Sequence, residues 1–190
     1  MSAAPLVKIA ATTAAEICSR FEMRKEPLQL LREGMPPREF VEALLANKHY
    51  VAGIDFMAHA LPPREGIWWG CLCVQHAFGD ALSPADRAAC IAAVQWVLRP
   101  GEETRAAAGA PAQAAGPESA AGSLAAAAFQ TGGSVAPPKA PPMAPAPFVA
   151  SKAIANAVKL ASIKSPPVKI ADTQRAFIEL AIGIAEGRYI

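Results

Sequence analysis

The sequence predicts an all-α protein, a compact bundle of about seven or eight short helices with an Ala/Pro-rich segment packed across its surface. Three observations support this fold class. Apolar residues recur at intervals of three and four along most of the chain, as the buried face of a helix requires. Ser, Thr and Pro stand where those stripes begin. No stretch shows the sustained alternation of β-branched and aromatic residues that is typical of strands.

In the first half of the chain, each predicted helix has a recognisable start. Thr13 opens a segment with the spacing of a capping box. Pro36-Pro37 and Pro62-Pro63 suit a first helical turn, where the missing N–H of proline costs nothing. Ser83 is an N-cap residue followed by proline and an acidic side chain. The apolar stripes that follow these starts are Ile17 and Phe21; Phe40, Val41, Leu44 and Leu45; Val51, Ile54, Ala58 and Leu61; Ile67 to Phe78; and Ile91, Val94, Val97 and Leu98.

Residues 106–147 contain 17 Ala, 8 Pro and 5 Gly among 42 positions, and this composition supports two interpretations. One is a flexible linker. The other is a short Ala-rich helix over residues 119–130, followed by a stiff polyproline run. Because this run has few charges, we expect residues 136–147 to pack on at least one of the three Trp side chains. Beyond the run, Ser151 and Asp172 are the expected caps of two further helices.

Composition limits the function classes. Lys and Arg number 18 against 16 Asp and Glu, with no basic block, so we expect no nucleic-acid partner. No apolar run is long enough to cross a membrane, and no signal peptide is evident, which favours a cytoplasmic location. We divide the chain into an N-terminal tail, residues 1–11, and one helical domain, residues 12–190, that includes the Ala/Pro-rich segment.

The sequence contains one group of residues that could bind a metal or form a nucleophile, namely Cys71, Cys73 and His76. On one helix, Cys71 and Cys73 differ by about 200° around the axis and cannot easily share a metal ion. We therefore predict no metal site, no cofactor and no catalytic residue. A metal-dependent or cysteine-based enzyme, with a site near these residues and Asp55 and His59, remains the alternative.

A polar cluster is expected where two helices meet at Pro62-Pro63. Asp55 and His59 are spaced i and i+4, and Arg64 and Glu65 follow the break. One interpretation is an acid/base pair in a cleft, and the other is a structural cluster that fixes the corner. We favour the structural interpretation and expect Asp55 or His59 to hydrogen-bond near Arg64 or Glu65.

Two adjacent tryptophans, Trp68 and Trp69, follow this corner. Neighbouring helical residues point about 100° apart, so one ring can enter the core while the other lies near the surface. Core packing of both rings is one interpretation. A groove that receives a Pro-rich segment is the other.

Two segments resemble a bacterial family of uncharacterised helical proteins: HALPPREGIWWGCLC, residues 59–73, and GGSVAPP, residues 132–138. The resemblance covers roughly residues 12–188 and implies that the Ala/Pro-rich segment belongs to the domain. It implies no catalytic residues, and it associates such proteins with bacterial secretion systems. The expected function is a non-enzymatic helical adaptor or accessory protein that binds another, unidentified protein.

We predict that Cys18, Cys71, Cys73 and Cys90 are reduced, since nothing in the sequence indicates export to an oxidising compartment. Thiol titration of the unfolded protein without reductant should find all of them free. A result of two free thiols, or none, would contradict both the expected cytoplasmic location and the prediction that the cysteines are reduced.

Overall fold

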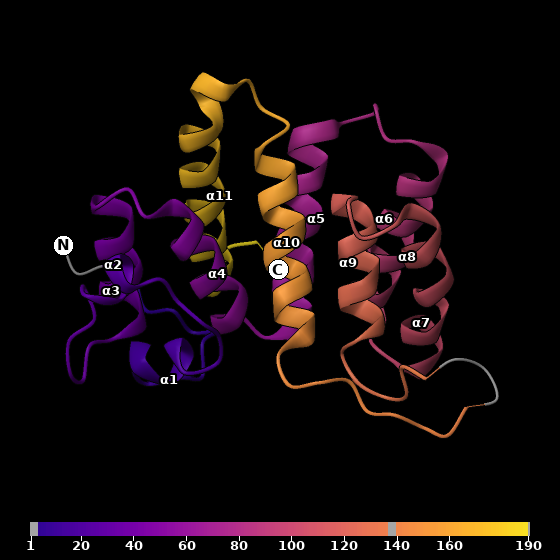
Figure 1. Ribbon diagram of the computed structural model, residues 1–190, viewed down its shortest axis with the longest axis horizontal. Helices are drawn as coiled ribbons and strands as arrows, with labels where there is room; N and C mark the ends of the chain where they lie inside the picture. Colours follow the sequence, from indigo (N-terminus) through magenta and orange to yellow (C-terminus); the bar gives the residue numbers. More distant parts are fainter. Residues whose placement is uncertain (1–3, 137–139, 190) are drawn as a thin grey trace.

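The computed structural model describes residues 4–136 and 140–189, and within these ranges all of the regular structure is helical (Figure 1). The all-α prediction is confirmed. Among the described residues, no helix is both long and apolar enough to cross a membrane. The elements are α1 (Ala14–Cys18), α2 (Lys25–Leu28), α3 (Pro37–Ala46), α4 (Tyr50–Ala60), α5 (Pro63–Phe78), α6 (Pro84–Leu98), α7 (Glu102–Ala107), α8 (Gly109–Ala115), α9 (Ala120–Phe129), α10 (Val149–Ser162), the 3₁₀ turn η1 (Pro167–Lys169) and α11 (Ile170–Ala185).

The predicted start signals act as expected in the first half of the chain. Thr13 accepts a hydrogen bond from the Glu16 N–H, and the Glu16 carboxylate accepts one from the Thr13 N–H, which completes the capping box. The Ser83 hydroxyl accepts a hydrogen bond from the Asp86 N–H at 3.1 Å. The later starts differ, because α10 begins at Val149, after a left-handed Phe148, and α11 begins at Ile170 rather than after Asp172.

The core is organised around α5, against which α6, α9, α10 and α11 pack. In Figure 1, α4 and α11 lie on one side of α10, and α6, α8 and α9 lie on the other. Three glycines allow close helix contacts. A Cβ atom at Gly53 would lie 2.8 Å from Ile178, one at Gly66 would lie 2.9 Å from Ile154, and one at Gly70 would overlap Leu124. The bare backbone therefore lets large side chains from α9, α10 and α11 enter the centre of the bundle.

The Ala-rich part of the middle segment is a core helix. Most residues of α9 are buried, and Leu124 at its centre is fully buried between α9 and α5. Arg105 of α7 fixes the far end of this helix, since its guanidinium pairs with Glu102 and donates to the Phe129 carbonyl at 2.6 Å. The linker interpretation is therefore wrong for α9. Its alanines serve as small packing surfaces.

The Pro-rich run differs from its expectation. Residues 140–147 are exposed apart from Pro145, which is half-buried. The run folds back on residues 134 and 135, because the Val135 N–H donates to the Met143 carbonyl at 2.9 Å and the Met143 N–H donates to the Ser134 hydroxyl. The run is therefore held by backbone hydrogen bonds and not by burial on a Trp ring. Residues 137–139, which belong to the expected docking segment, lie outside the described residues.

The described part of the expected N-terminal tail lies against α11 and α5. The Lys8 N–H donates to the Ala185 carbonyl at 2.9 Å, and the Lys8 ammonium lies 3.7 Å from the Glu65 carboxylate. Leu6 and Ile9 pack against the core. This segment therefore binds to the end of α11 and to the start of α5.

We predict that Gly70→Ala destabilises the protein. The added methyl would displace the fully buried Leu124 side chain at a cost of up to about 3 kcal/mol, offset by about 1 kcal/mol of better helix propensity. Urea unfolding should therefore show a net loss of about 1 to 2 kcal/mol.

Two variants control this test. Gly132 has open space around it, so Gly132→Ala should change the stability by about 0.5 kcal/mol or less. In a Leu124→Val background, which shortens the opposing side chain, Gly70→Ala should cost less than in the wild type. An equal cost in both backgrounds would contradict the proposed overlap.

Candidate functional site

The predicted polar corner between α4 and α5 does not form as expected. Each of its side chains binds a different part of the fold. The Asp55 carboxylate pairs with the Lys159 ammonium of α10 at 2.7 Å, and the Arg64 guanidinium donates to the Val97 carbonyl of α6 at 2.8 Å. Glu65 faces Lys8, as described above. No hydrogen bond joins Asp55 or His59 to Arg64 or Glu65, so that expectation is wrong.

His59 is only 3% exposed and makes its polar contact within its own helix. Its Nδ1–H donates to the Asp55 carbonyl at 2.8 Å, so Nε2 carries the lone pair, and Nε2 is buried without a partner. The ring stacks on Phe21 at a centroid distance of 4.5 Å, and Phe148 lies tilted on it at 6.3 Å. The corner histidine is therefore held mainly by aromatic packing.

Burial removes the His59 ring from water and so lowers its pKa, and this desolvation is the largest of several influences on that pKa. The backbone and carboxylate of Asp55 oppose this shift, whereas the positive charges of Lys152 and Arg20 add to it. Arg20 also donates to the His59 carbonyl at 2.7 Å and lies over the Phe148 ring. Neutral His59 is thus the form that the folded protein accommodates.

The two adjacent tryptophans diverge, and both hydrogen-bond to the end of the chain. Trp69 is fully buried, and its indole N–H donates to the Phe177 carbonyl of α11 at 2.8 Å. Trp68 is half-buried and donates to the Tyr189 carbonyl at 3.1 Å. Both rings therefore fasten α11 and the residues after it to α5.

The residues of the alternative enzyme hypothesis do not converge. Cys71 and Cys73 are buried in α5, whereas His76 is exposed with its ring edge-on to Phe177. Burial raises the pKa of both thiols, and it raises the pKa of Cys18 and of Cys90 to about 11, which disfavours the thiolate. Across the described parts of the chain, no group of three or more His, Cys, Asp or Glu side chains could hold a metal ion.

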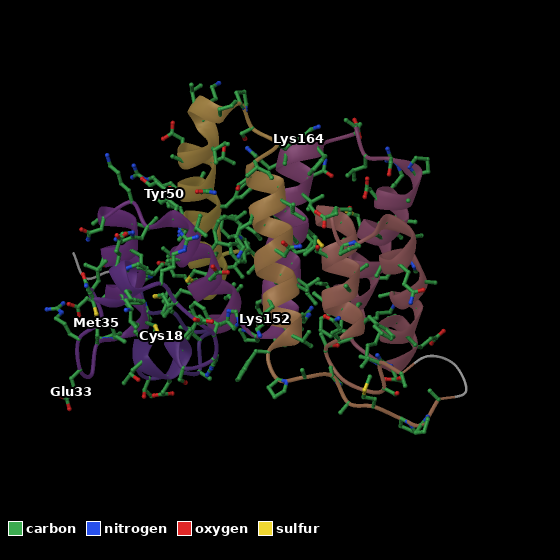
Figure 2. All side chains as sticks on the ribbon, viewed as in Figure 1. Cys18, Glu33, Met35, Tyr50, Lys152 and Lys164 are labelled. Carbon is green, nitrogen blue, oxygen red and sulfur yellow. The ribbon has the colours of Figure 1, made fainter. Side chains whose placement is uncertain are left out.

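One predicted residue, Asp55, does line a cleft. This cleft has a volume of about 430 Å³ and lies where α2, α4, α10 and α11 meet. The Asp55–Lys159 ion pair belongs to its wall, and Tyr50 lies at the start of α4 beside α11 (Figure 2). The remaining lining residues are Phe21, Glu22, Met23, Arg24, Glu26, Pro27, Lys48, His49, Val51, Ala52 and Gln174.

Both apolar and charged side chains line the cleft. Phe21, Met23 and Tyr50 are half-buried, and Val51 is 48% exposed although it is apolar. Exposed charged residues of both signs also line it, namely Glu22, Arg24, Glu26 and Lys48. The left-handed backbone of Lys48, with φ of 60°, makes the turn from α3 into α4 that presents this face. We name this surface, defined by the lining residues above, the α4 cleft.

Sequence reasoning found Asp55 but missed the rest of the α4 cleft. The helical stripe includes Val51, yet nothing local indicates that it is exposed. Lys159 is more than one hundred positions from Asp55 along the chain, so the sequence offers no signal for their pairing. Phe21 was assigned to a core face, and it is shared between the α4 cleft and the His59 stack.

Comparison with known proteins gives one match. Residues 40–185 match the model of a family that is described as a family of unknown function (DUF6931). A search of curated proteins found no match, and neither did a search of solved structures. The matched range runs from α3 to the end of α11 and includes α9 and the Pro-rich run.

We predict that the protein loses stability as the pH falls below about 6.5, the pKa of an unperturbed histidine. In this range the unfolded chain protonates His59, whereas the folded chain, whose His59 pKa is lowered, does not, so the free energy of unfolding falls. His59→Leu should show a smaller loss between about pH 7 and pH 5 in urea unfolding curves. His76→Gln, which changes an exposed histidine, should lose as much free energy of unfolding over this pH range as the wild type. If the wild type and His59→Leu lose the same amount, His59 is not the cause of the pH dependence.

Proposed function

We propose that this chain, which belongs to the DUF6931 family of unknown function, is a non-enzymatic helical adaptor that binds another protein at the α4 cleft. The observation that carries the proposal is the composition of the cleft. Protein interfaces combine apolar and aromatic side chains with polar ones, and they are enriched in Tyr, Phe, Met and Arg. The α4 cleft has this composition, since Phe21, Met23, Tyr50 and Val51 line it together with charged residues of both signs.

The state of the reactive side chains also favours binding over catalysis. The Asp55 carboxylate is neutralised by Lys159, and the His59 ring is enclosed by Phe21 and Phe148. A general acid or base must reach the atom that it protonates or deprotonates, and a nucleophilic thiol must ionise. The buried cysteines, with raised pKa values, are poorly suited to that role.

The size of the α4 cleft suits a short segment of a partner chain. A volume of about 430 Å³ accommodates a few side chains. We expect the partner to insert an apolar side chain beside Val51 and to place charged groups of both signs against the charged residues of the cleft. Because the resemblance described above implies an association with bacterial secretion systems, we propose a component of such a system as the first candidate partner.

We predict that Val51→Asp weakens partner binding about tenfold or more, because it places a charge among the apolar side chains of the cleft. The measurement is a pull-down from the native host with quantitative mass spectrometry, followed by titration of the recovered partner with the purified wild type and variant. Leu98→Asp is the matched control, since Leu98 is 65% exposed and lies outside the α4 cleft.

The two variants separate the outcomes of this experiment. A partner that binds wild type and Leu98→Asp equally and binds Val51→Asp weakly supports the adaptor function at this cleft. A partner that binds all three equally would contradict the α4 cleft as the binding site. If the pull-down with the wild type recovers secretion-system components and the pull-down with Val51→Asp does not, the result would support a secretion-system component as the partner.

A further inference from the structure

A second hollow lies across α10 from the α4 cleft. It has a volume of about 590 Å³ and is formed where the end of α5, the start of α6, the α8–α9 connection and the end of α10 meet. Its lining is largely apolar and contains Phe78, Leu160 and five alanines, namely Ala85, Ala114, Ala115, Ala120 and Ala121. Alanine side chains leave room for a projecting side chain to approach the backbone closely. We name this hollow the apical groove.

An apolar projection stands beside the apical groove. Ile163 lines it at the end of α10 and is 58% exposed, although its side chain is apolar. A large apolar side chain that remains in water on one edge of an apolar hollow is typical of an interaction site. The same face therefore offers both a hollow and an apolar side chain that could enter such a hollow.

The two edges of the apical groove carry opposite charges. Lys164 lies on the α10 edge, and Figure 2 shows it at that end of α10. Asp86 and Glu118 lie on the edge formed by α6 and the segment before α9. Among the described residues, none of these three side chains takes part in an ion pair. Each edge thus presents charge that the fold leaves unneutralised.

From this arrangement we infer that the apical groove binds a second copy of the chain in a symmetric dimer. A two-fold axis uses the same patch on both copies, so residue i of one copy meets residue j of the other, and the reverse contact forms as well. Rotation about such an axis places the Lys164 edge of each copy on the Glu118 edge of the other. The Ile163 side chain of each copy then enters the alanine-lined hollow of its partner copy.

A second copy fits this face better than an unrelated helix, because the patch complements itself in both charge and shape. A partner of uniform charge would be repelled by one of the two edges. The inference is separate from the proposed adaptor function, since the α4 cleft lies on the opposite side of α10 and would stay open in the dimer. Two adaptor clefts would then be carried by one assembly.

The test is the mass of the full chain in solution, measured by sedimentation velocity over a range of concentrations. We expect a monomer–dimer equilibrium for the wild type. Lys164→Glu and Glu118→Lys should each raise the dimer dissociation constant about tenfold or more, because each brings like charges together at both edges.

Mixing these two variants gives the decisive result. In a heterodimer of Lys164→Glu with Glu118→Lys, both edge contacts again join opposite charges, so the mixture should dimerise although neither variant does so well alone. Two chains that had merely misfolded would not restore a dimer. Failure of the mixture to restore dimerisation would overturn the two-fold pairing of these edges.

A further pair of variants tests the apolar contact. Ile163→Asp should abolish the dimer, whereas Leu98→Asp, an equally drastic change at an exposed apolar residue elsewhere, should leave it intact. A wild type that sediments as a monomer at every concentration would overturn the inference and leave the adaptor proposal unaffected. A dimer that persists in Ile163→Asp and in both charge variants would assign dimerisation to another face and would equally overturn it.

Discussion

The fold depends on how closely other helices approach α4 and α5. Gly66 and Gly70 are spaced i and i+4, so they lie on one face of α5, and Ile154 and Leu124 enter there. Gly53 admits Ile178 into α4 in the same way. Each inserted side chain is fully buried, so the three glycines determine where α9, α10 and α11 can lie. The two hollows that flank α10 follow from that placement.

The start of a helix could be predicted where the signal is local. Thr13, Ser83 and the paired prolines act within one helical turn, so their neighbours in sequence are also their neighbours in space. The start of α10 was missed because Phe148 adopts a left-handed conformation, and its contacts are with Arg20, in the turn after α1, and His59 of α4, which are both distant in sequence. No local pattern contains that information.

Composition alone misjudged both halves of the middle segment. Many alanines and few charges are typical of a linker, yet α9 is a core helix because its small side chains match the bare face of α5. The prolines, in turn, were expected to bury against at least one Trp ring, but two of these rings, Trp68 and Trp69, already hydrogen-bond to Tyr189 and to α11. For the candidate site, Asp55 could be identified from its spacing to His59. Its ion-pair partner on α10 could not, because packing over a long sequence separation brings the two together.

The exposed loop formed by residues 140–147 has a consequence for chain topology. The loop contributes little to the core, whereas α9 and α10, the helices on either side of it, pack on each other. Exposed loops of this kind tolerate inserted domains and breaks in the chain, so an insertion here would leave every described helix in place. The covalent connection between α9 and α10 is thus separable from the way in which these helices pack.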